Sequence, residues 1–279
     1  MMMPASRFSW HHLNQWNLGI LGIVLLVLAG LLYQWAARRA APWPPSRVAL
    51  FFTGLAVTFL STQSVIGAYD MEYFSAHMIQ HLALIMIAAP LFAYSAPLDL
   101  ARAAGGPSVS RVLDSRPMKA LLHPVTGFVL YAVFIPATHL TGFFNVMLEH
   151  EWVHHTEQIS FLVVGYLFWR HAFGVEHDCV LHPGLRLLYV MAAVPVDTIT
   201  GLALAMTSTN PFSKYTMGSP GHGASTSAVL DNVHLGGAIM WIGGDALMLL
   251  WCIPIAITWV RYEDARTKVL DAELDAAGL

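Results

Sequence analysis

The stretch LGILGIVLLVLAGLLYQWAA, residues 18–37, is almost uninterrupted in its apolar character and is followed directly by Arg38 and Arg39. A helix needs about 20 apolar residues to cross the hydrocarbon core of a bilayer. A cleaved signal peptide has a shorter apolar region and a small-residue cleavage site. The length of this stretch and the two arginines after it favour a retained, stop-transfer transmembrane helix.

Six further apolar runs of similar character follow this one along the chain. The seven predicted spans are Leu18–Ala37, Val48–Tyr69, Phe74–Ala96, Leu121–His139, Trp152–Phe173, Leu185–Met206 and Leu230–Val260. Backbone polar groups must be satisfied internally in lipid, so helices are expected. We therefore predict an all-α, polytopic membrane protein, divided into an extracytoplasmic N-terminal segment (1–17), a seven-helix transmembrane domain (18–260) and a cytoplasmic tail (261–279).

Composition supports this class, because 56% of the 279 residues are hydrophobic and only 11% are charged. Soluble domains carry about 25% charged residues. The net charge of −3 gives no indication of nucleic-acid binding. The two cysteines, Cys179 and Cys252, are far apart and predict neither a disulfide framework nor a thiolate metal site.

The distribution of Lys and Arg predicts the orientation. The loops after the first, third and fifth spans and the C-terminal tail share one predicted side of the membrane, and they contain twelve of the fourteen Lys and Arg residues. Only Arg7 and Lys214 lie on the other side. Because cytoplasmic loops carry the excess of positive charge, the N-terminus is predicted outside and the C-terminus in the cytoplasm. The predicted location is the cytoplasmic (inner) membrane of a bacterium.

Histidine is unusually frequent, with 14 residues, and ten of these fall at or near the predicted outer ends of the spans. His77 and His81 are four residues apart, which places both imidazoles on one face of a helix. His150 and His154 repeat this spacing in a later span. A lone histidine at a membrane interface is more commonly a polar cap than a ligand, but two such pairs at one level favour metal binding.

The predicted metal ligands are His77, His81, His139, His154, His150, His155 and His234. Glu157, Asp197, Asp231 and Asp245 are predicted as acceptors behind the ligands or as proton sites, because ionisable residues within spans are costly. For Asp197 and Asp245, a structural hydrogen bond to Thr198, Thr200 or a neighbouring histidine is an equal alternative. Imidazole suits copper, zinc, iron and nickel, and the outer methionines, Met78 among them, add a preference for Cu(I).

Several motifs resemble the CtaG family of cytochrome c oxidase assembly proteins. They are His77-Met-Ile-Gln-His81, the Ala-Pro-Leu repeats at 89–91 and 96–98, His123-Pro-Val125, His139-Leu140, the run His154–Trp169, and Asp231 followed by Gly236-Gly-Ala-Ile-Met-Trp241. The resemblance covers about Val48 to Val260. It implies a seven-helix inner-membrane protein that supports formation of a haem-copper oxidase, plausibly by handling copper, with His77, His81, His139 and His154 at the family's histidine positions.

Two departures from the family pattern bear on the site. Ala137-Thr138 stands where the family often has Trp before a histidine, and Gln158 stands where a further histidine is expected after Glu157. His155 or His150 could take the place of the histidine expected at position 158.

The leading hypothesis is thus an assembly factor that binds Cu(I) or Cu(II) and serves a haem-copper oxidase subunit in the lipid bilayer, with a soluble copper chaperone as a further candidate partner. The alternatives are a haem-binding or electron-transfer membrane protein, in which histidines ligate haem axially, and a metal or proton transporter that uses Asp197 and Asp245. An enzyme is the least favoured class, because no nucleophile–base pair stands out in the sequence.

Overall fold

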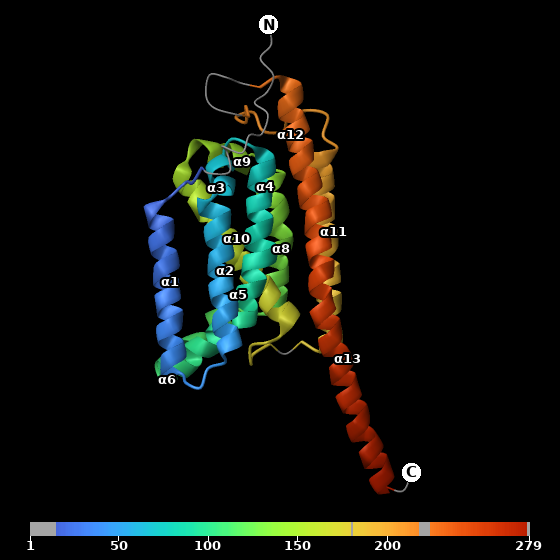
Figure 1. The fold of residues 1–279 in the computed structure, drawn as a ribbon. Helices are drawn as coiled ribbons and strands as arrows, with labels where there is room; N and C mark the ends of the chain where they lie inside the picture. Colours follow the sequence, from blue (N-terminus) through green and yellow to red (C-terminus); the bar gives the residue numbers. More distant parts are fainter. Residues whose placement is uncertain (1–14, 180, 218–223, 278–279) are drawn as a thin grey trace.

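The computed structural model of the 279-residue chain describes residues 15–179, 181–217 and 224–277, and the regular elements in these ranges are all helices. The helices form an elongated bundle in which most axes run in one common direction (Figure 1). We call the end at which α1 begins the upper end and the end toward which α13 extends the lower end, as they appear in Figure 1. The predicted all-α class is confirmed for the described residues.

Residues 15–70 contain three helices at one side of the bundle. They are α1 (Ile20–Arg39), α2 (Pro45–Gln63) and the short α3 (Val65–Tyr69). Pro45 occupies the first position of α2, where its missing N–H is not needed. Ser64 caps α3 by accepting a hydrogen bond from the Ile66 N–H. The break at Ser64 thus divides the second predicted span into two helices.

The third predicted span is helical from Phe74, but a π-helical segment separates two α-helical parts. Its parts are α4 (Phe74–Leu82), the π-helix η2 (Ala83–Ala88) and α5 (Ala89–Ser95). The helix ends at Ala96, whose φ of 51° is in the left-handed region. A π-helical segment within an α-helix is uncommon and is often associated with a functional site.

The basic segment after Ala96 was predicted to be a loop, and this is wrong, because it forms α6 (Pro97–Leu113) and α7 (Arg116–Leu121). A proline at the first or second position begins each of these helices. Gly106, with φ 65°, bends α6 just before Pro107. The helix lies across the lower end of α1 (Figure 1), where Arg39 Nε donates to the Ala104 carbonyl at 2.8 Å.

The remaining helices complete the bundle. They are α8 (Pro124–His139), α9 (Phe143–Glu149), α10 (Glu151–Phe173), α11 (Pro183–Ala205), α12 (Thr226–Ala238), the π-helix η3 (Ile239–Gly243) and α13 (Gly244–Ala277). The last three are continuous, and α13 carries on well below the rest of the bundle (Figure 1). The predicted tail from Arg261 therefore extends this final helix as far as Ala277.

Within the described residues, five helical segments are long and apolar enough to cross a membrane, and the pair α8 and α9, bent by 67°, gives a sixth if counted as one span. The five are Ile20–Arg39, Pro45–Tyr69, Phe74–Leu113, Pro183–Ala205 and Thr226–Ala277. The helix α10 matches the fifth predicted span and has 23 residues, but His, Glu and Gln in its first half lower its apolar content. A seven-span count and the orientation stay predictions.

The helices α11 and α12 pack with their backbones close together. A Cβ atom added at Gly237 would lie 2.5 Å from the Ala205 backbone nitrogen and 2.7 Å from the Gly201 carbonyl oxygen. Neither atom can move without shifting a helix. Glycine is needed here because it lets two backbones approach each other, as expected for membrane helices.

We expect Gly237→Ala to lower the free energy of unfolding by about 1–3 kcal/mol, the usual cost of overpacking a well-packed core. The clash outweighs the better helix propensity of alanine. Gly142→Ala is the matched control, since a Cβ there meets nothing within 4 Å. Chemical unfolding of both variants in mixed micelles would measure the difference, and equal stabilities would show that this helix contact tolerates a methyl group.

Candidate metal site

Two helices bring three chemically active side chains together in the upper half of the bundle. His77 and His81 lie four residues apart on α4, and their ring centroids are 4.0 Å apart. Glu157 faces them from α10. The three residues are only 1%, 3% and 2% exposed. We call these three residues the histidine–glutamate site.

The nitrogen and oxygen atoms of this site converge without bonding to one another. Glu157 Oε2 lies 3.6 Å from His77 Nε2 and 3.8 Å from His81 Nε2, beyond hydrogen-bond length. All three atoms are buried and have no hydrogen-bond partner among the described residues. Each buried atom left unpaired costs about 1–3 kcal/mol. One cation placed between them would satisfy all three at once.

The spacing also suits a metal ion. One ligand atom from each of the three residues can be chosen so that all lie within 4.8 Å of one another. Ligands held about 2 Å from a common ion are roughly 3–3.5 Å from each other, so the observed separations need only a small contraction. Two imidazoles and one carboxylate make a three-ligand site that leaves a coordination position open.

A chain of hydrogen bonds fixes which nitrogen of His81 is free to bind. His139 Nδ1 is 2.8 Å from the Ile135 carbonyl oxygen, and since a carbonyl only accepts, Nδ1 carries the hydrogen. His139 Nε2 must then accept from His81 Nδ1, 3.3 Å away. His81 Nε2 is consequently left with an unshared lone pair, directed toward Glu157. Phe161 stacks on the His81 ring with centroids 3.7 Å apart.

The position of His139 therefore differs from its predicted role as a direct ligand. Its ring contacts His81, and its Nε2 is used in that contact. A metal-binding histidine commonly donates its second ring nitrogen to an acceptor that fixes its tautomer. His139 is such an acceptor for His81.

His154 lies beside the histidine–glutamate site, but its Nε2 is directed elsewhere. Its ring centroid is 5.8 Å from that of His77, while its Nε2 lies 3.2 Å from Asp70 Oδ2. Asp70 also accepts a hydrogen bond from Gln80, and Gln158 donates to the Gln80 side-chain oxygen at 3.2 Å. The carboxylate of Asp70 and the two amides thus form a buried polar layer around His154.

Neither Gln80 nor Asp70 is among the site residues predicted from the sequence. The available signal was Gln80 itself, a residue between His77 and His81 that is 0% exposed. A fully buried amide needs partners for its donors, and it finds them in Asp70 and the Ser61 carbonyl.

Four other predicted site residues do not join the histidine–glutamate site. His150 is exposed at the start of α10, and His155 is exposed and lies 3.7 Å from Glu151. His234 Nε2 is 2.8 Å from the Thr207 carbonyl, and Asp231 is exposed. His11, His12 and His222, also at the predicted outer side, lie outside the described residues.

Asp197 and Asp245, the two aspartates within the predicted spans, each accept a hydrogen bond from a hydroxyl group. Tyr131 donates to Asp197 Oδ2 at 2.6 Å, and Thr198 donates to the Asp245 carboxylate at 2.9 Å. The Asp245 contact is the structural hydrogen bond that the sequence offered as an alternative. Asp197 is 2% exposed and lines a small cavity that also touches His81 and His139.

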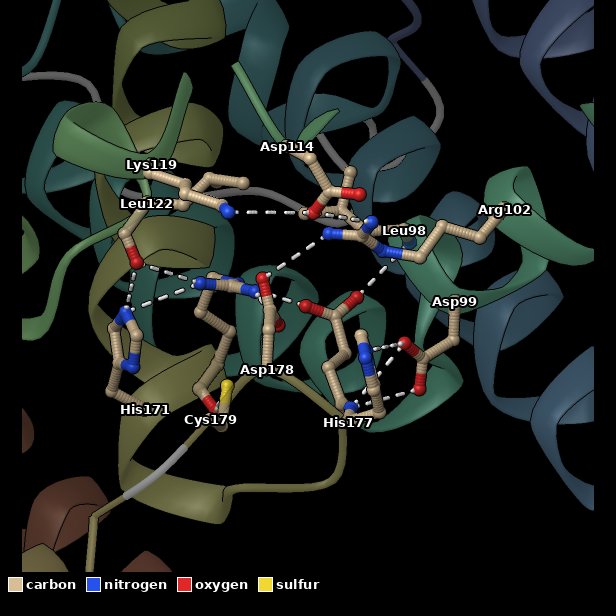
Figure 2. A network of polar contacts seen from close by, with 12 residues as sticks. Leu98, Asp99, Arg102, Asp114, Lys119, Leu122, His171, His177, Asp178 and Cys179 are labelled. Atoms are coloured by element: carbon tan, nitrogen blue, oxygen red, sulfur yellow. Dashed lines mark hydrogen bonds and ion pairs between the residues drawn. The ribbon is translucent and has the colours of Figure 1, made fainter. Parts of the chain in front are cut away.

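A second polar network lies at the lower end, around Arg170, whose side chain is 0% exposed (Figure 2). Arg170 Nε donates to Glu176 at 2.8 Å, and its two terminal nitrogens donate to the Leu122 carbonyl and to Asp178. Arg102 extends the network by bridging Asp114 and Asp178. These contacts connect α10 to α6, α7 and the loop after Phe173.

Glu176, Asp178 and Cys179 in this network also lie close enough to hold an ion. The guanidinium of Arg170 already pairs with both carboxylates. Burial raises the pKa of the Cys179 thiol to about 12, so it stays protonated, and it donates to the Arg170 carbonyl instead. We assign this network a structural role, and the histidine–glutamate site remains the candidate metal site.

The chain is similar to three longer mycobacterial proteins that are described as uncharacterized. The uncharacterized protein Mb0105 of Mycobacterium bovis is 28% identical over 94% of this chain and 45% of its own length, and MT0111 of Mycobacterium tuberculosis gives the same values. ML1998 of Mycobacterium leprae is 29% identical over 83% of this chain and 37% of its own length. The chain thus spans less than half the length of these curated relatives. No solved structure matches it.

A family model described as cytochrome c oxidase caa3 assembly factor (Caa3_CtaG) matches residues 30–262. That range contains every residue of the histidine–glutamate site, of the polar layer around His154 and of the Arg170 network, and it covers most of the chain. The chain belongs to the Caa3_CtaG family of cytochrome c oxidase assembly factors.

Proposed function

We propose that this chain supports assembly of a haem-copper oxidase by binding one copper ion at the histidine–glutamate site. The observation that carries the proposal is the convergence of three buried, unpaired atoms, His77 Nε2, His81 Nε2 and Glu157 Oε2. Buried polar atoms in proteins are almost always paired, so three unpaired atoms at one point support a site for a bound cation.

Both the chemistry of the ligand atoms and the family to which the chain belongs favour copper as the bound metal. Imidazole ligands accept several divalent metals, and Cu²⁺ binds most tightly among the first-row divalent ions at a given nitrogen and oxygen site. The family assembles an oxidase, and a haem-copper oxidase contains copper. We place the chain in the cytoplasmic membrane of a bacterium, with an oxidase subunit as receiver and a soluble copper chaperone as donor.

Copper content tests the site directly. Purified wild-type chain loaded with Cu(II) and desalted is expected to keep about one copper per chain, and His77→Ala/His81→Ala is expected to keep close to none, since two of three ligands are gone. His155→Ala is the matched control, because His155 is exposed on the adjacent helix. Equal copper in the wild type and the double variant would remove these residues from the metal site.

The orienting role of His139 gives a second test. His139→Leu removes the acceptor for His81 Nδ1–H, and a loss of copper affinity of about 10–100-fold is expected, as for other residues that orient a ligand. His139→Gln keeps an acceptor oxygen and should retain most of the affinity. Competition with a chromophoric chelator measures both variants. If glutamine lowered the Cu(II) affinity as much as leucine, His139 would be a ligand of the histidine–glutamate site or a packing residue and not an orienting one.

The haem alternative finds less support around these histidines. The cavity that adjoins His81 and His139 measures about 10 Å³, far smaller than a porphyrin. An absorption spectrum of the purified chain distinguishes the two cases, because bound haem gives a Soret band and bound copper does not.

A further inference from the structure

The small cavity beneath the histidine–glutamate site has an unusual lining. It is enclosed by Met78, His81, Leu82, Ile85, Met86, Ile135, His139, Phe161, Asp197 and Met240. Three of these ten residues are methionines, and they are 1%, 0% and 4% exposed, respectively, along the chain. The cavity measures about 10 Å³, which is room for one water-sized guest.

The three methionines come from parts of the chain that are far apart in sequence. Met78 and Met86 lie eight residues apart on α4 and η2, so they share a helical face with His81. Met240 lies on η3 and reaches the cavity from the other side of the bundle core. Both π-helical segments of the described chain, η2 and η3, thus contribute to the wall.

The lining is chemically suited to a soft cation. Thioether sulfur favours Cu(I), whereas carboxylates suit harder ions. The histidine–glutamate site offers two nitrogens and one oxygen, while the cavity offers three thioethers, the ring of His139 and one carboxylate, that of Asp197, whose Oδ2 already accepts a hydrogen bond from Tyr131. His81 lies between the two, with Nε2 toward Glu157 and Nδ1 toward His139.

We propose that this cavity is a second copper site, selective for Cu(I), that takes the ion from the histidine–glutamate site through rotation of the His81 ring. The proposal rests on the copper site proposed above and assigns the deeper position to Met78, Met86 and Met240, with His139 as the nitrogen ligand. Binding there breaks the His81–His139 hydrogen bond and frees His139 Nε2 for the ion. The transfer involves no change in oxidation state, because the ion enters and leaves as Cu(I).

X-ray absorption at the copper edge tests this on the full chain. Wild-type protein loaded with Cu(I) under anaerobic conditions is expected to show sulfur scattering, and protein loaded with Cu(II) to show only nitrogen and oxygen. Met86→Leu/Met240→Leu, which nearly conserves side-chain volume, is expected to lose the sulfur scattering and about 10-fold or more of its Cu(I) affinity. Its Cu(II) affinity should stay within about twofold of the wild type.

The control variant is Met206→Leu, because Met206 is 74% exposed and lies outside the cavity. Wild-type protein that binds Cu(I) with nitrogen and oxygen scattering alone would overturn the deeper site and leave the histidine–glutamate site in place. Protein that retains neither Cu(I) nor Cu(II) would overturn both proposals. Sulfur scattering that survives in the double methionine variant would also overturn the assignment of the ligands.

Discussion

Replacing Arg170 with methionine is expected to lower the free energy of unfolding by about 3–5 kcal/mol, because the change leaves the buried carboxylate of Glu176 without its counter-ion. Glu176 is 2% exposed and receives a 2.8 Å hydrogen bond from Arg170 Nε. The same guanidinium donates to Asp178 and to the Leu122 carbonyl, so three acceptors lose a partner together. Chemical unfolding of the full chain in mixed micelles measures the effect.

Arg266→Met is the control for this experiment, since Arg266 is 71% exposed and its pairing with Glu263 is expected to contribute little. Arg170→Met/Glu176→Met should recover part of the lost stability, because a buried ion pair can often be replaced by apolar side chains at little cost. If Arg170→Met unfolded at the same denaturant concentration as Arg266→Met, the network of Figure 2 would not stabilise the lower end of the bundle.

Most helices of this fold could be predicted from apolar runs alone. The predicted run Trp152–Phe173 differs from α10 by one residue at its start, and Leu185–Met206 lies within a few residues of α11. The basic segment after Ala96 was predicted incorrectly because its charged residues suggested a loop, whereas prolines at helix-starting positions begin two helices there. Charge indicates which side of a membrane a segment prefers, but not whether it is helical.

The candidate site was predictable in part, for a geometric reason. The i,i+4 spacing of His77 and His81 fixes their common face within one helix. No spacing relates α4 to α10, so the sequence could not show that Glu157, predicted as an acceptor behind the ligands, supplies the third unpaired atom. The sequence also could not show the ring orientations of His139 and His154, which face His81 and Asp70, respectively.

Replacing Glu157 with glutamine is expected to change metal binding and stability in opposite directions. The amide cannot supply the negative charge that attracts a cation, so copper affinity should fall by about 100-fold or more, near the cost of removing one member of a buried charge pair. The glutamine NH₂ group can donate to the lone pair of His77 Nε2 or His81 Nε2, both now unpaired. The metal-free variant should therefore gain about 1 kcal/mol of stability.

The opposite changes in copper affinity and in stability distinguish a metal ligand from a structural residue. If Glu157 only stabilised the fold, the glutamine variant would be less stable than the wild type. If Glu157 is a ligand held among unpaired atoms, the variant is more stable and binds copper less tightly. Glu151→Gln is the matched control on the same helix, because the Glu151 side chain is 88% exposed and neither quantity should change. A bacterial strain that depends on this chain should then keep Glu157→Gln in its membrane and still lack most of its haem-copper oxidase activity. Full oxidase activity with Glu157→Gln, at wild-type levels of the chain, would mean that the carboxylate does not take part in oxidase assembly.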